Sequence, residues 1–292
     1  MLEQYIVLGL AQGSLYALMA LGMVLIFKTT DIVNFGQSDM TMFSAYVGFT
    51  LLVGLGWPFW AALPVVIAFG FLLGVAVERL ALRPAKEAPV VSLLIVTLGV
   101  ALMLNAIASW IWGFDPKSLP YAISGPPLVL GNVIITRHDL VIFGTTILLS
   151  LGFFALLKFT KIGTAMRAAA QNKLGAQLLG IPVYRIQMLS WGLGVALGAV
   201  AGVLIAPLVF LDLTVMIFVM LKGFAAAVLG GFTSLPGAIV GGLFVGLFES
   251  LLIAVPFELV NQLKETLVFV LIIVLLAVRP QGLLGEPIHR RV

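Results

Sequence analysis

The segment VVIAFGFLLGVAV, residues 65–77, contains no charged side chain and no side chain that forms hydrogen bonds. A membrane-spanning helix is apolar throughout, whereas the strands of a membrane barrel alternate apolar and polar positions. The rest of the chain has the same character, since 62% of its 292 residues are hydrophobic and 10% are charged. Soluble domains average about 45–50% apolar and about 25% charged residues. The segment and the composition therefore predict an all-α, polytopic membrane protein and exclude a soluble enzyme and a disordered chain.

The number of apolar residues limits the number of membrane helices. At 62% of 292 residues there are roughly 181 apolar positions, and each span needs about 20, so there is room for about nine. We expect about eight or nine transmembrane helices in a single transmembrane domain, residues 1–292, with no separate soluble domain. The expected spans are 5–27, 40–55, 58–77, 90–112, 139–158, 186–206, 216–232, 238–255 and 266–278. The second, third and seventh are short or interrupted by Gly and Pro, which makes them candidates for re-entrant segments.

Basic residues are unevenly distributed between the spans. The stretch 158–185 holds five basic residues and no acidic residue, and the stretches 78–89 and 279–292 are also rich in Lys and Arg. Lys and Arg accumulate in cytoplasmic loops, so these three stretches are predicted to be cytoplasmic and the nearly neutral loop 113–138 external. With nine spans, the N-terminus lies outside and the C-terminus in the cytoplasm. The net charge of +4 is then explained by membrane topology, and we expect a lipid bilayer rather than nucleic acid as the partner.

Several kinds of chemistry are excluded by the residues present. The chain has no cysteine, and its two histidines, His138 and His289, lie far apart. It contains neither the phosphate-binding motif G-x-x-x-x-G-K-[ST] nor the catalytic motifs G-x-S-x-G and H-E-x-x-H. We therefore expect no catalytic site, no metal site and no cofactor on this chain. His138 and Asp139 begin a predicted span, and we interpret them as a polar start of a helix, where a negative charge is favourable.

One cluster of polar residues, DIVNFGQSDM (31–40), separates two apolar segments and includes Asn34, Gln37 and Asp39. Polar groups at membrane depth are costly and commonly mark a transport pathway. Two hypotheses are equally compatible with the sequence. Either the stretch dips into the helix bundle, where these side chains line a polar path, or it is a cytoplasmic loop in which they are solvated.

Two further charged residues lie within apolar sequence. Lys222 has long apolar runs on both sides, and Glu249 lies in FVGLFESLL. Lys222 is either a snorkelling residue near a helix end or an internal residue paired with a carboxylate or a backbone carbonyl, and Glu249 is a candidate partner. The intervening break GGFTSLPG (230–237) must be enclosed by protein, because irregular backbone is not tolerated against lipid.

The basic stretch 158–185 is predicted to contain a helix. Its Ala-rich and Leu-containing sequence from 164 to 179 favours one continuous helix that Gly180 ends and that Pro182 follows. A loop that only sets topology needs no helix, whereas a docking element for a cytoplasmic partner does.

Small residues recur at four-residue spacing within the spans. Gly194, Gly198 and Gly202 form one such series, and the pairs Gly70/Gly74, Gly237/Gly241 and Gly242/Gly246 repeat it. Because lipid supplies no hydrophobic drive for helix association, small residues serve to bring helix backbones close together. These series predict helix packing rather than a binding site.

The chain resembles the LivH-type permeases of branched-chain amino-acid ABC transporters almost from end to end. In that family the second block usually reads Ala-Gln-Gly-Glu where this chain has Gly36-Gln37-Ser38-Asp39, so the acidic side chain is one methylene shorter here. The blocks that carry the resemblance are GLAQGSLYALMALGMVLIF (9–27), DIVNFGQSDMTM (31–42), RAAAQNKLGAQLLGI (167–181), LKGFAAAVLGGFTSLPGAIVGGLFVGLFES (221–250) and RPQGLLG (279–285).

The resemblance implies a type II ABC importer-like permease of the bacterial inner membrane. Such a subunit carries no ATPase of its own, so ATP is bound by partner subunits. The implied partners are a second homologous permease, two ABC ATPase subunits and an external or periplasmic substrate-binding protein. The implied solutes are leucine, isoleucine and valine, or a related small polar solute.

The resemblance also assigns roles to residues. The helix within 158–185 becomes the coupling helix that contacts the ATPases. Its ATPase-coupling candidates are Arg167, Gln171, Asn172, Gly180 and Ile181. The translocation-pathway candidates are Asn34, Gln37, Asp39, Lys222 and Glu249. An alternative function from another class is a stand-alone, ion-coupled secondary transporter or channel.

Overall fold

The computed structural model describes residues 2–131, 133–255, 263–278 and 281–285. This part of the chain is mostly helical, and each predicted span lies on a helix whose ends differ by a few residues from the prediction. The basic tail residues Arg279, Arg290 and Arg291, and His289, lie outside the described residues. The helices are α1 (Leu2–Thr30), α2 (Gln37–Phe49), α3 (Phe59–Val77), α4 (Val90–Trp112), α5 (Arg137–Phe159), α6 (Lys161–Gln171), α7 (Lys173–Leu178), α8 (Val183–Ile205), α9 (Val215–Gly230), α10 (Leu235–Ile253) and α12 (Lys264–Val278).

Six of the described helices are long and apolar enough to cross a membrane: α1, α3 with its continuation to Ala85, α4, α5, α8 and α10. The other predicted spans are shorter. The helix α2 is 13 residues long and continues as a π-helical turn, Thr50–Gly54. Shorter apolar helices lie at Val215–Gly230 and Thr266–Leu275. Length and composition in the described residues thus support six spans and do not confirm the expected eight or nine.

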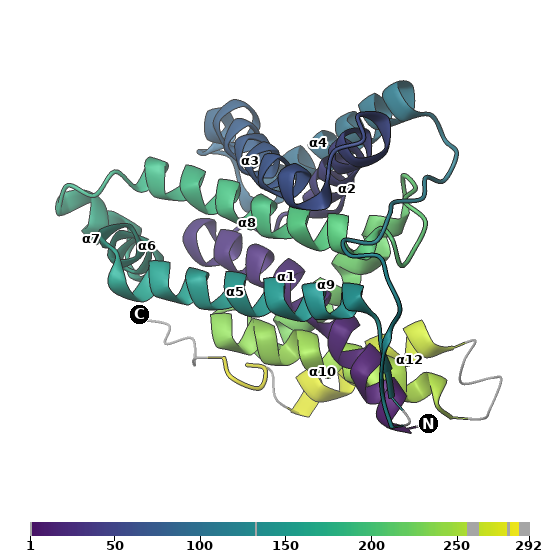
Figure 1. Cartoon of the computed structure of the whole chain (residues 1–292). Helices are drawn as coiled ribbons and strands as arrows, with labels where there is room; N and C mark the ends of the chain where they lie inside the picture. Colours follow the sequence, from purple (N-terminus) through teal and green to yellow (C-terminus); the bar gives the residue numbers. More distant parts are fainter. Residues whose placement is uncertain (1, 132, 256–262, 279–280, 286–292) are drawn as a thin grey trace.

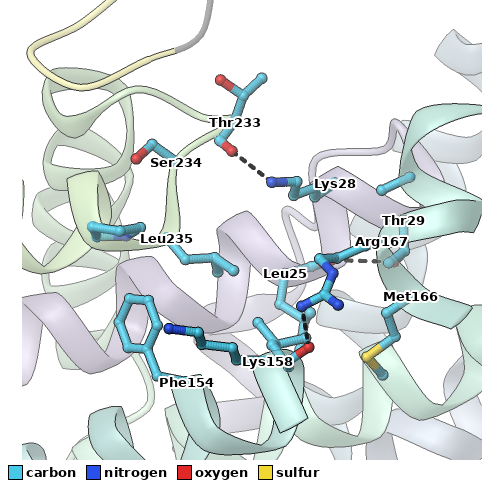
Figure 2. Close-up of a pocket in the computed structure, with 13 residues that line it drawn as sticks. Leu25, Lys28, Thr29, Phe154, Lys158, Met166, Arg167, Thr233, Ser234 and Leu235 are labelled. Atoms are coloured by element: carbon cyan, nitrogen blue, oxygen red, sulfur yellow. Dashed lines mark hydrogen bonds between the residues drawn. The ribbon is translucent and has the colours of Figure 1, made fainter. Parts of the chain in front are cut away.

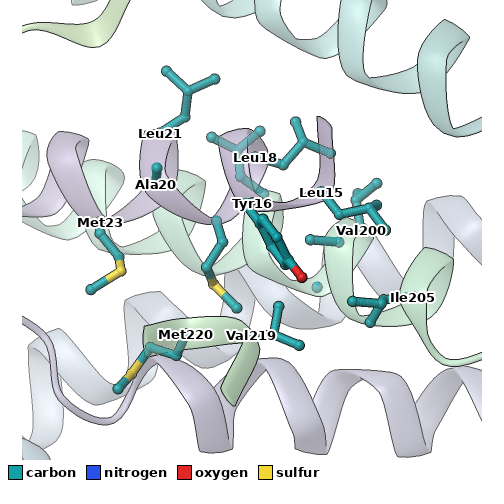
Figure 3. Close-up of a cluster of buried hydrophobic side chains, with 14 of the residues drawn as sticks. Leu15, Tyr16, Leu18, Ala20, Leu21, Met23, Val200, Ile205, Val219 and Met220 are labelled. Atoms are coloured by element: carbon teal, nitrogen blue, oxygen red, sulfur yellow. The ribbon is translucent and has the colours of Figure 1, made fainter. Parts of the chain in front are cut away.

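The helix α1 lies at the centre of the bundle, in contact with α5, α8, α9 and α10 (Figure 1). Its most apolar 18-residue window is 83% buried, as is that of α8, whereas those of α3, α4 and α5 are 28–33% buried. A helix that is apolar all round is expected to be buried on all sides. Figure 3 shows the core around α1, where Leu15 and Tyr16 lie near Val200 of α8 and Val219 of α9.

Glycines at the predicted positions let these helices approach closely. A Cβ atom on Gly246 of α10 would collide with the backbone of Gly13 in α1, and one on Gly194 of α8 would lie 2.7 Å from the carbonyl oxygen of Gly22. A Cβ on Gly70 of α3 would lie 2.7 Å from that of Ala199 in α8. The backbones themselves therefore form these interfaces, which is the packing role predicted for the glycine series.

The two ends of the bundle differ. Figure 1 shows α6 and α7 at one end, and the N-terminus with a short β-hairpin at the other. The hairpin was not expected in an all-α fold. It pairs β1 (Leu128–Leu130) with β2 (Val133–Ile135) in antiparallel register, and the side chain of Gln4 bonds both the N–H and the carbonyl of Ile134.

The residues that follow the hairpin begin α5 as predicted. Thr136 is the N-cap, and Asp139 accepts hydrogen bonds from the N–H and hydroxyl of Thr136, which completes a capping box. His138 is buried, and its Nε2 lies 2.8 Å from the carbonyl oxygen of Leu204. The polar pair therefore stabilises a helix start, and the interpretation of Asp139 as a helix N-terminal charge is confirmed.

The single helix predicted over 164–179 is wrong, because the structure has two helices there. The break lies at Asn172, whose backbone is extended with φ −154° and ψ 102°. Its side-chain oxygen accepts a hydrogen bond from the N–H of Gly175 and so caps the start of α7. Asn competes with the helical backbone for hydrogen bonds in this way, and the Ala-rich composition around it conceals the break.

Candidate functional site

The polar stretch before α2 dips into the bundle from Asn34 onward. Asn34 and Gln37 are 1% and 0% exposed. The amide of Asn34 donates to Oε1 of Gln37 at 2.9 Å, and Nε2 of Gln37 donates to the carbonyl of Gly194 in α8 at 3.1 Å. These two residues therefore satisfy each other and fix α2 against the glycine face of α8, because buried polar groups need partners.

The first residue of the same stretch behaves as a loop residue instead. Asp31 has a positive φ of 61°, and its side chain is 70% exposed. Its carboxylate lies 2.6 Å from Nζ of Lys173 on α7, and Nζ also donates to the carbonyl of Thr30 at 3.0 Å. The stretch 31–40 is thus divided: its start is solvated and linked to α7, whereas Asn34 and residues 36–40 are buried.

Asp39 is a buried carboxylate with neutral partners. It is 7% exposed, and its oxygens accept from the hydroxyl of Ser38 at 2.8 Å and from the amide of Asn105 in α4 at 3.2 Å. Asn105 also donates to the carbonyl of Leu213, just before α9. Within the described part of the chain, no cation forms an ion pair with Asp39. The site therefore places a carboxyl group where α2, α4 and the start of α9 meet.

Lys222 and Glu249 form an internal ion pair between α9 and α10. Nζ of Lys222 lies 2.6 Å from Oε1 of Glu249, and their side chains are 13% and 5% exposed. The second carboxylate oxygen accepts from the hydroxyl of Tyr16 on α1 at 2.9 Å, and the ammonium lies 5.6 Å from the centre of that ring. Of the two hypotheses for Lys222, the structure supports the internal pair. The three side chains connect three helices.

The break GGFTSLPG between α9 and α10, predicted to be enclosed by protein, is only partly enclosed, because Pro236 is exposed and residues 232–234 are half-buried. The N–H groups of Leu283 and Leu284 donate to the carbonyls of Leu229 and Gly230 at the end of α9. Ser234 caps α10 by accepting from the N–H of Gly237. The RPQGLLG block, for which the sequence suggested no role, thus contributes residues that cap α9.

The end of α7 has the geometry of a standard helix stop. Gly180 has φ 79°, and its N–H donates to the carbonyl of Gln177, while the N–H of Ile181 donates to that of Ala176. This pair of bonds is a Schellman motif, in which glycine is favoured because its φ is positive. Ile181 is half-buried and packs against the main hydrophobic core.

The other coupling candidates are all exposed and differ in their contacts. Gln171 and Arg167 are both exposed, but Arg167 also donates hydrogen bonds to the carbonyl of Leu157 at the end of α5 and to the hydroxyl of Thr164. The apolar residues best placed for a partner are instead three leucines at the tip of this region. Leu174, Leu178 and Leu179 are 67%, 81% and 82% exposed.

Sequence reasoning missed these leucines, together with Tyr16 and Asn105. Tyr16 and Asn105 are polar residues within apolar spans, the same signal that identified Lys222 and Glu249. The predicted pathway residues fall into three groups, Asn34 with Gln37, Asp39 by itself, and Lys222 with Glu249. Within the described residues, no side-chain hydrogen bond joins one group to another.

The helices and their buried polar pairs define a multi-span membrane protein. Within the described residues, no group of three or more His, Asp or Glu side chains is placed to hold a metal ion. The chain belongs to the family described as the permease component of the branched-chain amino acid transport system, which it matches over residues 5–276.

Similar proteins support this assignment along nearly the whole chain. The high-affinity branched-chain amino acid transport system permease protein LivH of Escherichia coli is 32% identical over 297 residues, covering 96% of this chain and 94% of LivH. BraD of Pseudomonas aeruginosa, with the same description, is 31% identical over 301 residues, covering 97% and 96%. Among solved structures, PsaBC of Streptococcus pneumoniae matches at 14% identity and a TM-score of 0.49, covering 96% of this chain and 91% of that one.

Proposed function

We propose that this chain is the membrane permease subunit of an ATP-driven importer that moves leucine, isoleucine, valine or a related small polar solute into the cell. The observation that carries the proposal is the 96% coverage of the chain by a permease for branched-chain amino acids. The chain contains no P-loop motif, so partner subunits supply ATP hydrolysis. This hypothesis is preferred to a stand-alone ion-coupled transporter or channel because the named relatives are permease components of transport systems.

The proposed complex holds a second homologous permease, two ATPase subunits and an external substrate-binding protein, with this chain forming one transmembrane domain over 1–292. Of its parts, α6 and α7 are the proposed docking element for an ATPase. Exposed leucines on a predicted cytoplasmic helix suit a groove on a protein partner, since they gain by being removed from water. Arg167, Gln171 and Asn172 flank this tip, Gly180 ends α7, and Ile181 packs against the core.

A direct route leads from the docking element to the bundle. Lys173 of α7 bonds the carbonyl of Thr30 at the end of α1 and the carboxylate of Asp31. Asp31 begins the segment that carries Asn34, Gln37 and Asp39 into the bundle. Movement of α7 under an ATPase subunit would therefore pull on the end of α1 and the start of α2 together.

Among the pathway candidates, Asp39 is proposed to meet the solute. It is a buried carboxylate with neutral hydrogen-bond partners, and an amino acid carries an ammonium group that can complement its charge. Asn34, Gln37, Lys222 and Glu249 already have protein partners and are proposed to hold the helices around the path.

Asp39→Asn is expected to lower amino-acid uptake at least tenfold while leaving the thermal unfolding midpoint nearly unchanged. The amide keeps the hydrogen-bonding shape but lacks the negative charge, so a cationic group loses its attraction. Asp39→Glu, which restores the acid usual in the family, should retain uptake. Uptake of Asp39→Asn at the wild-type rate would contradict the assignment.

The proposed orientation places the N-terminus outside and the C-terminus in the cytoplasm of the cell membrane, with α2, α9 and α12 completing a set of about nine spans. Because the chain has no native cysteine, single cysteines report its topology cleanly. A membrane-impermeant thiol reagent should label Ser118→Cys in intact cells and label Gln171→Cys only after permeabilisation; both positions are exposed. Labelling of Gln171→Cys from outside would reject this orientation.

The function is tested by reconstitution in proteoliposomes. The chain is combined with its partner permease, the ATPases and the binding protein, and uptake of radiolabelled leucine, isoleucine and valine is measured with and without ATP. Uptake that needs ATP and every partner supports the proposal. Uptake by the chain alone under a proton or sodium gradient would establish the ion-coupled alternative instead.

A further inference from the structure

A cavity of about 340 Å³ lies where α1, α5, α6 and the start of α10 meet (Figure 2). It lies apart from the groups around Asp39 and Glu249, none of which lines it. Lys28 reaches it from α1, Lys158 from α5 and Arg167 from α6. Three cations from three helices therefore converge on one cavity.

Among the described residues, no acidic side chain lines this cavity or forms an ion pair with its three cations. Lys28 donates to the carbonyl of Thr233 and Arg167 to that of Leu157, which are neutral groups. The helix α10 begins at the cavity wall with Ser234, so the positive end of its dipole adds to the field. The cavity is thus built for an anion.

The remaining wall is apolar. Leu25, Phe154, Leu157, Met166 and Leu235 contribute hydrocarbon surface to the cavity. A small inorganic anion would make no favourable contact with this apolar surface. An amphiphile with an anionic head and hydrocarbon chains can contact both the cations and the apolar wall. The charge and the wall together select an anionic lipid over a soluble anion.

The depth of the cavity agrees with a lipid headgroup. The candidate spans α1 and α5 end at Thr30 and Phe159, within two residues of Lys28 and Lys158. The ends of spans lie at the boundary between hydrocarbon and headgroups, and basic pockets between helices on the cytoplasmic side are suited to anionic headgroups. On the proposed orientation, this end is cytoplasmic.

We propose that this cavity binds a phospholipid with an anionic headgroup, with Lys28, Lys158 and Arg167 around the phosphate and the apolar wall against the acyl chains. The proposal concerns the chain and its membrane. Lipid binding at this cavity does not depend on which solute is carried, so it can be tested separately from uptake.

The test uses the full-length chain, purified and delipidated in detergent. Phosphatidylglycerol, phosphatidylcholine with the same acyl chains, and inorganic phosphate are titrated separately while the thermal unfolding midpoint is followed. Native mass spectrometry counts retained lipid. The test variant is Lys28→Gln/Lys158→Gln, and the control is Lys161→Gln/Arg185→Gln, which removes two exposed cations that do not line the cavity.

Phosphatidylglycerol should raise the unfolding midpoint of the wild type and of the control, and remain bound in the mass spectrum. The test variant should bind it about 25-fold more weakly, since each of the two basic residues near an anionic headgroup contributes about fivefold. Equal effects of phosphatidylcholine, an equal shift with inorganic phosphate, or equal loss in the control would each overturn the proposal. The proposal would also be overturned if ATPase subunits displaced the lipid and their docking required Lys28 and Lys158.

Discussion

Glu249→Ala should sharply lower the thermal unfolding midpoint of the purified chain, because it leaves the ammonium of Lys222 buried without a counter-ion. Removing one partner of a buried ion pair costs about 3–5 kcal/mol. The hydroxyl of Tyr16 also loses its hydrogen bond to this carboxylate, so α1, α9 and α10 are all affected. The measurement is the unfolding midpoint in detergent, together with the yield of folded chain from membranes.

The double variant Lys222→Met/Glu249→Leu is the control. It removes both charges but keeps side chains of similar size, so it distinguishes the effect of an unpaired charge from the effect of lost packing. Replacing a buried ion pair with apolar residues of similar size is often neutral for stability or stabilising. We expect the double variant to recover most of the lost stability and to retain uptake, since the pair is proposed to hold helices rather than to carry an ion. Restored stability with abolished uptake would instead place the pair in the pathway.

Leu178→Asp/Leu179→Asp should abolish coupling to ATP hydrolysis while leaving the bundle folded. The two side chains are more than 80% exposed, so the isolated chain loses little when they change. If both are buried in a partner groove, their loss weakens docking by about 3 kcal/mol or more, which is over a hundredfold in affinity. Co-purification of the ATPases and stimulation of ATP hydrolysis by loaded binding protein should both be lost.

Two matched variants show whether the leucines or the added charge produce this effect. Gln177→Asp places a charge on the same exposed helix without removing a leucine, and it should leave coupling largely intact. Leu178→Ala/Leu179→Ala removes the apolar surface without adding charge, and it should weaken docking. Wild-type coupling in both leucine variants would show that α7 only sets membrane topology.

The positions of the helices could be predicted because each span is a continuous apolar run, and such runs do not depend on neighbouring helices. Residues 90–112, for example, form α4 with the predicted bounds. The glycine series was likewise interpretable, since four-residue spacing marks one face of a helix. The break at Asn172 was not predicted, because its cause is one side-chain hydrogen bond within a sequence that favours helix.

Which side chains contact each other inside the helix bundle depends on helix packing, and the spacing of residues along the sequence does not reveal that packing. Tyr16 and Glu249 are 233 residues apart, and they meet only because glycines let α1 and α10 lie in close contact. Lys222 and Glu249 were each recognised as costly in lipid, yet whether they pair depends on the relative rotation of α9 and α10. Asn34 and Gln37 could not be assigned to a loop or to the bundle for the same reason.

The capping of α9 by Leu283 and Leu284 has a consequence for how the protein is made. These residues leave the ribosome after every described helix has been synthesised, so the last carbonyls of α9 lack these partners until then. Membrane insertion of the helices can proceed in chain order, but the junction between α9 and α10 is completed by sequence that arrives later. A nascent chain interrupted before this point lacks the N–H groups that these two carbonyls of α9 accept from in the finished protein.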